Sequence, residues 1–183
     1  MGKRAYIRIE QAIGRPSEDD KFLEAFGIQP DVFSASDMSA FLAANKDSRE
    51  IEIELRTDGG DIDEAFDISD QLFATGKKII VKAFRCNSAG TVLLLTPELA
   101  NRLVSDNVQA IIHNPYFPRL EGQLDATTLA EYEAIVQKAQ DRLLNFYVSR
   151  CGLDSIQKNE IANMMAKQTD MGADRLIKYG FAG

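Results

Sequence analysis

The chain contains one histidine, His113, which lies where an apolar segment runs into Asn114-Pro115. Imidazole is the side chain best suited to proton transfer near neutral pH, so acid–base chemistry by an imidazole in this chain belongs to His113. A plainer role stays open, in which His113 only ends a strand. The ten serines of the chain offer many nominal partners, so position rather than composition must select one.

Among these serines, Ser88 has the position that nucleophilic catalysis needs. It lies in the sequence RCNSAG, residues 85–90, between a predicted strand and a short apolar helical turn. A nucleophile on such a junction is held clear of the sheet, and free N–H groups at the helix start stabilise negative charge beside it. Serine is also a common N-cap, so the residues alone leave both roles open.

A pair of glycines, Gly59-Gly60, ends the preceding predicted strand in a turn whose backbone can approach a ligand closely. Acyl transfer needs donors aimed at the developing oxyanion, and the N–H groups of Gly59 and Ala89 suit this task if the two turns lie side by side. Adjacent strand-to-helix turns in α/β folds often do so. The other interpretation is an ordinary pair of turn glycines.

Strands and helices alternate along the chain and predict an α/β fold of repeated β-turn-α units. The stretch around Gly14, Pro16, Gly27 and Pro30 predicts a surface connection, and Ser36 predicts the N-cap of a helix. No linker, low-complexity segment or repeat divides the chain. The predicted strands cover residues 5–9, 51–55, 78–84, 99–104 and 108–113, and the further predicted helices cover 62–76, 88–96, 127–149, 154–166 and 173–178.

Composition excludes several classes of function. The formal net charge of the 183 residues is −7 and no stripe of Lys and Arg is present, which argues against nucleic acid as a partner. No apolar run approaches the roughly 20 residues of a membrane span, and no signal peptide follows Met1. Cys86 and Cys151 form neither a CxxC motif nor a Cys/His cluster. We therefore expect a cytoplasmic protein without membrane contact, metal or cofactor.

These features together resemble the ClpP family of serine peptidases, within the ClpP/crotonase fold. The sequence TDGGDI, residues 57–62, is similar to the family's Ser-Pro-Gly-Gly turn; SAG, residues 88–90, to its nucleophile segment; and IIHNP, residues 111–115, to its histidine segment. Ser88 lies 29 residues after Gly59 and 25 before His113, which fits the family's register without a gap. Gly122-Gln123, the long helix and residues 164–182 extend the likeness to nearly the whole chain.

The resemblance implies a ClpP-like serine endopeptidase with Ser88 as nucleophile, His113 as proton carrier and the Gly59 and Ala89 N–H groups as the oxyanion hole. It implies one domain, residues 1–183, with a protruding handle at about 114–150, and a homo-oligomeric ring that pairs with a second ring through that handle. The implied substrate is a peptide or protein bound extended along a strand edge. No cofactor is implied.

The His-Asn-Pro form and the closing segment are more similar to the ClpP-like peptidases of phages and prophages than to housekeeping ClpP. The chain also starts almost at its first strand, without the segment through which housekeeping ClpP meets an unfoldase. Partnership with a Clp-type ATPase is therefore not expected. The expected protein is a phage-like, ATP-independent peptidase.

The sequence departs from the family's pattern beside the predicted site. Phe84 stands where the family has glycine and Asn87 where it has alanine, which predicts a narrowed or reshaped pocket. Asp58 replaces a proline and adds a negative charge near the oxyanion turn. The position of the family's aspartate, which orients histidine, falls on Gln168, and the nearest carboxylate is Asp170.

Glutamine can accept the Nδ1 proton of histidine, but it does not offset the charge of the imidazolium. In a serine protease, the change of this aspartate to its amide costs about 10⁴ in turnover. Gln168, with Asp170 as the alternative, therefore predicts slow or conditional activity.

Two other functions remain open at this stage. In the first, the chain is a catalytically impaired ClpP-like oligomeric scaffold, in which Phe84, Asn87, Asp58 and Gln168 record a decayed site. In the second, it is a crotonase-type enzyme acting on an acyl-CoA. The spacing of Ser88 and His113 counts against the second, because that chemistry needs an oxyanion hole but no such serine.

Overall fold

A computed structural model of the chain describes residues 3–20, 30–117 and 125–183. The described strands and helices are, in chain order, β1 (Arg4–Ile9), β2 (Ala12–Ile13), β3 (Val32–Phe33), α2 (Ala35–Ala44), β4 (Glu50–Thr57), α3 (Ile62–Ala74), β5 (Lys78–Cys86), α4 (Gly90–Leu94), the 3₁₀ helix η1 (Leu99–Asn101), β6 (Arg102–Gln109), β7 (Ile111–Ile112), α5 (Ala126–Cys151), α6 (Ser155–Ala166), β8 (Thr169–Asp170) and α7 (Ala173–Lys178). The expected alternation of strands and helices is confirmed.

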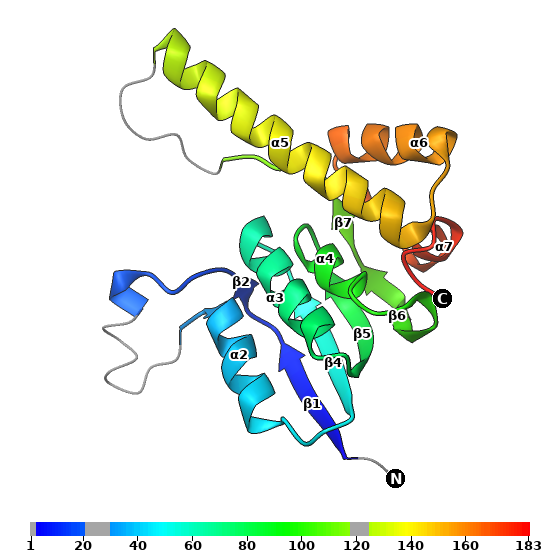
Figure 1. Cartoon of the computed structure of the whole chain (residues 1–183). Coiled ribbons are helices and arrows are strands. Elements are labelled where there is room, and N and C mark those ends of the chain that lie inside the picture. The colour runs from blue at the N-terminus through cyan, green and yellow to red at the C-terminus, as the bar shows by residue number, and fades with distance from the viewer. Residues whose placement is uncertain (1–2, 21–29, 118–124) are drawn as a thin grey trace.

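The centre of the fold is a parallel sheet with the strand order β1-β4-β5-β6. Helices α2, α3 and α4 lie together on one side of this sheet, and α5 projects from it as a long rod (Figure 1). Because β4 and β5 are adjacent and parallel, the turns that follow them meet at the same edge of the sheet. The two β-turn-α units that carry the predicted site are thus neighbours.

The two faces of the sheet differ in polarity because side chains alternate along each strand. On β4, the side chains of Ile51, Ile53 and Leu55 are fully buried in the core that the helices cover. The intervening glutamates carry ion pairs instead, such as Glu52 with Lys82 at 2.7 Å. Burial of the apolar face stabilises the sheet, whereas such partly exposed ion pairs contribute little.

The long helix α5 is joined to the rest of the fold at its carboxyl end. Its described start is capped by Asp125, whose side chain accepts a hydrogen bond from Thr128 N–H at 2.9 Å. Gly152 ends it in the left-handed conformation, with φ 66°. Beyond it, Asp154 and Gln157 form a capping box for α6, as the sequence predicted for Asp154.

Two expectations about the elements are wrong. The predicted strands over 99–104 and 108–113 are replaced by η1, one longer strand β6, and the short strand β7. The residues between the two predicted strands, Ser105-Asp106-Asn107, continue β6 with partly or fully exposed side chains. An edge strand tolerates such residues because solvent covers one of its sides.

The connection between β1 and α2 also differs from its prediction. It contains the strands β2 and β3, which pair in parallel, and Ile13 joins the turn after β4 through a bridge to Gly60. Gly27 of the predicted surface connection lies outside the described residues, as do Gly122-Gln123 and part of the predicted handle. Among the described residues, no helix combines the length and apolarity that a bilayer crossing requires.

The N-cap of α2 is Ser34 and not the predicted Ser36. Ser34 Oγ accepts a hydrogen bond from Asp37 N–H at 3.2 Å, and the Asp37 carboxylate accepts one from Ser34 N–H at 2.8 Å. This reciprocal pair is a capping box with aspartate in the third position of the helix. Ser36 lies exposed in the first turn of α2.

Ser34→Ala is expected to lower the free energy of unfolding by about 1 kcal/mol, because it removes the cap of α2. Ser36→Ala, the matched control two residues later, is expected to change it by less than about 0.5 kcal/mol. Denaturant titration of both variants measures the difference. Equal losses in the two variants would contradict the assignment of the cap.

Candidate active site

The turn after β4 and the turn after β5 are in direct contact. Gly59 has φ +90°, and a Cβ atom on it would lie 2.4 Å from Asn87 O and 2.8 Å from Ser88 Cβ. No side chain other than hydrogen fits between the two turns at this point. The side-by-side arrangement that the oxyanion hypothesis required is therefore present.

Ser88 adopts a left-handed backbone conformation with φ 52°. This conformation costs a residue with a Cβ roughly 1–2 kcal/mol, so neighbouring groups must hold it. Ser88 N–H donates to Ile111 O at 2.7 Å, and Ser88 O accepts from Thr91 N–H at 3.0 Å. The backbone of the predicted nucleophile is thus fixed from both sides.

The alternative role of Ser88 as an N-cap is wrong. Helix α4 begins at Gly90, its N-cap is Ala89, and no side chain caps it. Ser88 Oγ has no hydrogen-bond partner among the residues that the structure describes. The hydroxyl is left available to a substrate.

His113 directly follows β7 and is half-buried. Its Nδ1 lies 2.7 Å from Asn114 O. A carbonyl oxygen only accepts, so Nδ1 carries the proton in this contact and Nε2 is left as an acceptor. Within the described chain, no hydrogen bond joins His113 to Ser88 in this conformation.

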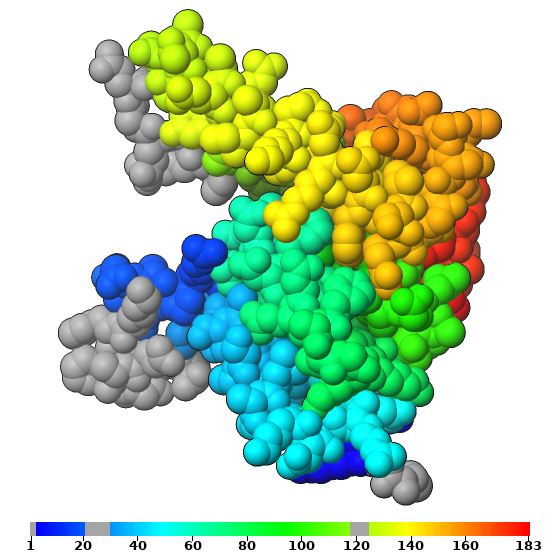
Figure 2. All heavy atoms as spheres, in the orientation of Figure 1, coloured from blue at the N-terminus to red at the C-terminus, as the bar shows by residue number. Residues whose placement is uncertain are grey.

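A cavity of about 670 Å³ brings the predicted residues together. Its lining includes Gly59, Ser88, Ala89 and His113. Figure 2 shows the surface hollowed between the yellow-green part of α5 and the blue to cyan-green elements below it. Helix α5 supplies an apolar wall, made of Ile135, Val136, Ala139 and Leu143.

The backbone donors at this cavity are not equivalent. Gly59 N–H donates to Thr57 Oγ1 at 3.1 Å, which occupies the donor that the sequence singled out. Ile13 N–H donates to Gly59 O, and Asp61 N–H donates to Ile13 O. In this parallel bridge the N–H of Gly60, which lies between the two bonds, points away from Ile13. Among the described residues, neither Gly60 N–H nor Ala89 N–H has a hydrogen-bond partner.

Sequence reasoning therefore missed Gly60 as a donor. The glycine pair was a visible signal, but which of the two N–H groups stays free depends on the pairing with Ile13, which lies far away in the sequence.

The two candidates for the orienting residue lie in different places. Strands β7 and β8 pair Ile112 with Thr169, and His113 and Gln168 are the residues that directly adjoin this pair in the chain. Gln168 and Asn114 also share an acceptor, because both N–H groups donate to Met165 O. The Gln168 side chain forms no hydrogen bond with His113 among the described residues.

Asp170 faces elsewhere. It lines a second cavity with Asp106, Asp174 and Arg175, and neither Ser88 nor His113 contributes to that cavity.

The unusual residues beside the site contact one another. Asn87 Nδ2 donates to Asp58 Oδ1 at 3.0 Å, and Arg85 Nε lies 3.3 Å from the same oxygen. The negative charge of Asp58 is thus partly balanced by its neighbours. The ring of Phe84 packs under the Arg56 guanidinium at 4.2 Å.

Neither Phe84 nor Asn87 lines the cavity. The two side chains therefore do not narrow the cavity directly, because Phe84 packs against Arg56, and Asn87 instead bonds to Asp58, a residue of the cavity lining.

The other reactive groups nearby do not compete with Ser88. Cys86 is fully buried, and burial raises the pKa of its thiol to about 12. The thiol therefore stays protonated and is a poor nucleophile. In the described part of the chain, no three residues of the His, Cys, Asp and Glu types lie close enough to hold a metal ion.

Comparison with known proteins was made on both sequence and structure. A model of the Clp protease family matches residues 32–183. The chain belongs to the Clp protease family. Its fold is similar to that of a single-substitution mutant of ClpP1 from Listeria monocytogenes, with a TM-score of 0.73 and 17% sequence identity. The match covers 97% of this chain and 88% of the ClpP1 chain, so the ClpP fold is confirmed. No curated protein matches this chain.

Gly59→Ala is expected to lower the free energy of unfolding by about 3 kcal/mol, because a Cβ collides with backbone atoms and φ is positive. Gly76→Ala is the matched control, since Gly76 also has positive φ but open space around its Cβ position. Its expected cost is about 1 kcal/mol. Denaturant titration compares the two, and equal costs would refute the close contact of the turns.

Proposed function

We propose that this Clp-family chain is a serine peptidase in which Ser88 is the nucleophile and His113 the proton carrier. One observation carries the proposal. Four groups line the same cavity: the Ser88 hydroxyl, the His113 imidazole and the N–H groups of Gly60 and Ala89; among the described residues, the hydroxyl and both N–H groups have no hydrogen-bond partner. The chemistry that such a set supports is acyl transfer.

In the proposed reaction, His113 Nε2 takes the proton of Ser88 as Oγ attacks a peptide carbonyl. The N–H groups of Gly60 and Ala89 stabilise the oxyanion, and Gly59 can join only by releasing Thr57 Oγ1. His113 then returns the proton to the leaving amine. A water molecule repeats the sequence on the acyl-enzyme and frees Ser88.

The resting conformation needs one adjustment before this reaction. No hydrogen bond joins Ser88 to His113 within the described residues, so the two side chains must rotate toward each other. Catalytic hydrogen bonds that are long in a free enzyme often tighten when substrate binds. Substrate binding or assembly is the event that we expect to align them.

The third member of the site is unusual. We propose that Asn114 O sets the resting tautomer of His113, and that Gln168, which adjoins the Ile112–Thr169 pair as His113 does, is the position from which a side chain assists it. Neither group neutralises the imidazolium that forms during attack. Slow basal turnover is the expected consequence.

The proposed substrate is a peptide or protein segment held in the cavity beside α5. Its apolar wall suits uncharged side chains, and main-chain hydrogen bonds along a strand edge tolerate many sequences. As in the family, we propose a homo-oligomeric ring with α5 in the handle of a single domain. Further parts of the proposal are a cytoplasmic, phage-like setting and no need for a Clp-type ATPase.

A second candidate is the non-catalytic scaffold. It is favoured by the missing bond between Ser88 and His113 and by the absence of a carboxylate on His113 Nδ1 among the described residues. It predicts assembly without covalent chemistry at Ser88.

A fluorophosphonate probe is expected to modify Ser88 and no other serine, detected by intact mass and peptide mapping. Ser88→Ala abolishes the modification, and His113→Ala slows it by about 10²- to 10⁴-fold because general-base catalysis is lost. Ser149→Ala, which removes an exposed serine of α5, serves as the matched control and keeps the wild-type rate. An unmodified wild-type protein, under conditions that label an active ClpP, would favour the scaffold.

Gln168→Asp is expected to raise the rate of probe labelling by at least about tenfold, because it places a carboxylate opposite His113 that offsets the imidazolium. Aspartate tolerates the positive φ of 49° at this position. Asp170→Asn is expected to leave the rate unchanged, because Asp170 lines the other cavity. A slower Asp170→Asn variant beside an unchanged Gln168→Asp variant would reverse the assignment.

A further inference from the structure

The carbonyl of Ser88 receives a second hydrogen bond that the reaction does not use. Besides Thr91 N–H, the hydroxyl of Thr91 donates to Ser88 O, at 2.6 Å. Thr91 is fully buried in α4. The strained backbone of Ser88 is therefore held by a side chain one helical turn away.

Thr91 in turn contacts the long helix α5. Its Oγ1 lies 2.6 Å from the hydroxyl of Tyr147, which is also fully buried. Because the Thr91 proton goes to Ser88 O, Tyr147 must be the donor in this pair. Burial raises the pKa of the Tyr147 phenol, so the phenol keeps its proton at any ordinary pH.

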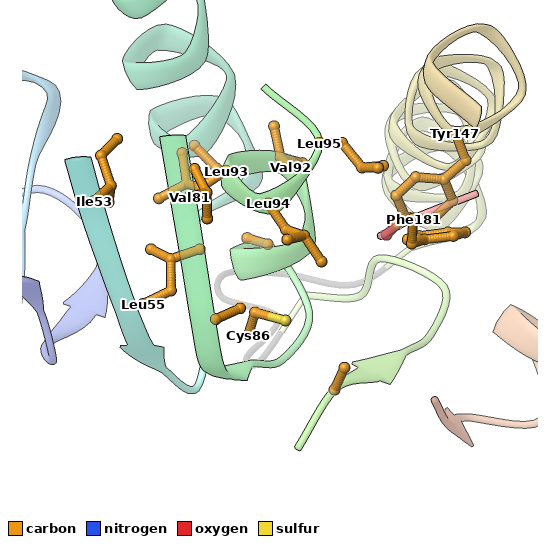
Figure 3. Packing of buried hydrophobic residues seen from close by; sticks show 14 of the residues in the cluster. Ile53, Leu55, Val81, Cys86, Val92, Leu93, Leu94, Leu95, Tyr147 and Phe181 are labelled. Atoms are coloured by element: carbon orange, nitrogen blue, oxygen red, sulfur yellow. The ribbon is translucent and has the colours of Figure 1, made fainter. Parts of the chain in front are cut away.

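The position of Tyr147 is itself fixed by packing. Figure 3 shows it projecting from α5 beside Phe181, and the two ring centroids lie 5.0 Å apart. Arg150, one turn further along α5, donates to the carbonyls of Leu95, Thr96 and Pro97 at the carboxyl end of α4. Helix α5 thus contacts the start of α4 through Tyr147 and the segment after α4 through Arg150, and it also forms a wall of the cavity.

We propose that Thr91 is a positioning residue for Ser88, and that Tyr147 couples the nucleophile's backbone to the seating of α5. The inference rests on the proposed peptidase function and extends it to regulation of the same site. Any displacement of α5, by substrate against its apolar wall or by contact with another copy of the chain, is transmitted through Tyr147 and Thr91 to Ser88.

A second pair of buried hydroxyl groups provides a control that distinguishes a positioning role of Thr91 from a general contribution to stability. Thr96 Oγ1 donates to Ser69 Oγ at 2.9 Å and lies 3.1 Å from Val92 O. Like Thr91, Thr96 is buried, but it lies just beyond the carboxyl end of α4 and forms no hydrogen bond with Ser88 among the described residues. Thr96→Val therefore removes a comparable hydrogen bond without touching the nucleophile.

The experiment uses the full chain with four substitutions: Thr91→Val, Thr91→Ser, Tyr147→Phe and Thr96→Val. Three quantities are measured for each variant: the fluorophosphonate labelling rate at Ser88, the hydrogen-exchange rate of the Ser88 amide, and the denaturation midpoint. The valine variants keep the shape of threonine and lose its hydroxyl, whereas Thr91→Ser keeps the hydroxyl.

Thr91→Val is expected to slow labelling by about tenfold and to speed exchange of the Ser88 amide by a similar factor. Tyr147→Phe has the same direction with a smaller effect, about threefold, because Thr91 can still donate. Thr91→Ser stays within about twofold of wild type in both rates. Thr96→Val lowers the denaturation midpoint as much as Thr91→Val does, but changes neither rate at Ser88.

A wild-type labelling rate and wild-type exchange in Thr91→Val would overturn the inference. So would equal changes in Thr91→Val and Thr96→Val, because Thr91 would then act through stability alone. If the wild-type protein is not labelled at all, the proposed peptidase function fails. Exchange of the Ser88 amide still decides the positioning role in that case, because it requires no chemistry at the hydroxyl.

Discussion

The close contact between two turns is the constraint on which the rest of this site depends. Gly59 lies so near Asn87 and Ser88 that no Cβ atom fits between them. This contact exists because β4 and β5 are adjacent parallel strands whose carboxyl ends meet at one edge of the sheet. It brings the N–H groups of Gly60 and Ala89 and the hydroxyl of Ser88 to the same cavity, and without it these groups belong to separate turns.

The same geometry links the nucleophile to the histidine. Ser88 N–H donates to Ile111 O, two residues before His113, so the backbone separation of the two groups is set by a main-chain bond. His113 is then oriented by the carbonyl that follows it rather than by a carboxylate. In the proposed reaction, this arrangement fixes the tautomer of His113 but does not compensate the charge of the imidazolium.

Helix α5 has more than one role in this arrangement. Its middle section is an apolar wall of the cavity, and its carboxyl end contacts α4 through Tyr147 and Arg150. Helix α5 therefore lines the cavity and also reaches Ser88 O indirectly, through the hydroxyl of Thr91. Two buried hydrogen bonds, from Tyr147 to Thr91 and from Thr91 to Ser88 O, make up this connection. Hydrogen bonds in such a buried, low-dielectric setting are stronger than those exposed to water.

The sequence by itself determined the alternating α/β architecture and the caps at Gly152 and Asp154, and it led to the proposal of Ser88 and His113, because all of these depend on local residue types and fixed spacings. It misplaced the cap of α2 and divided β6, where a neighbouring residue or an edge position outweighed local propensity. Only the tertiary structure decided that Gly60 N–H has no partner among the described residues, that Asp170 lines a different cavity from His113, and that Tyr147 reaches Thr91. Each of these depends on strand pairing or helix packing between residues far apart in the chain, which no local pattern encodes.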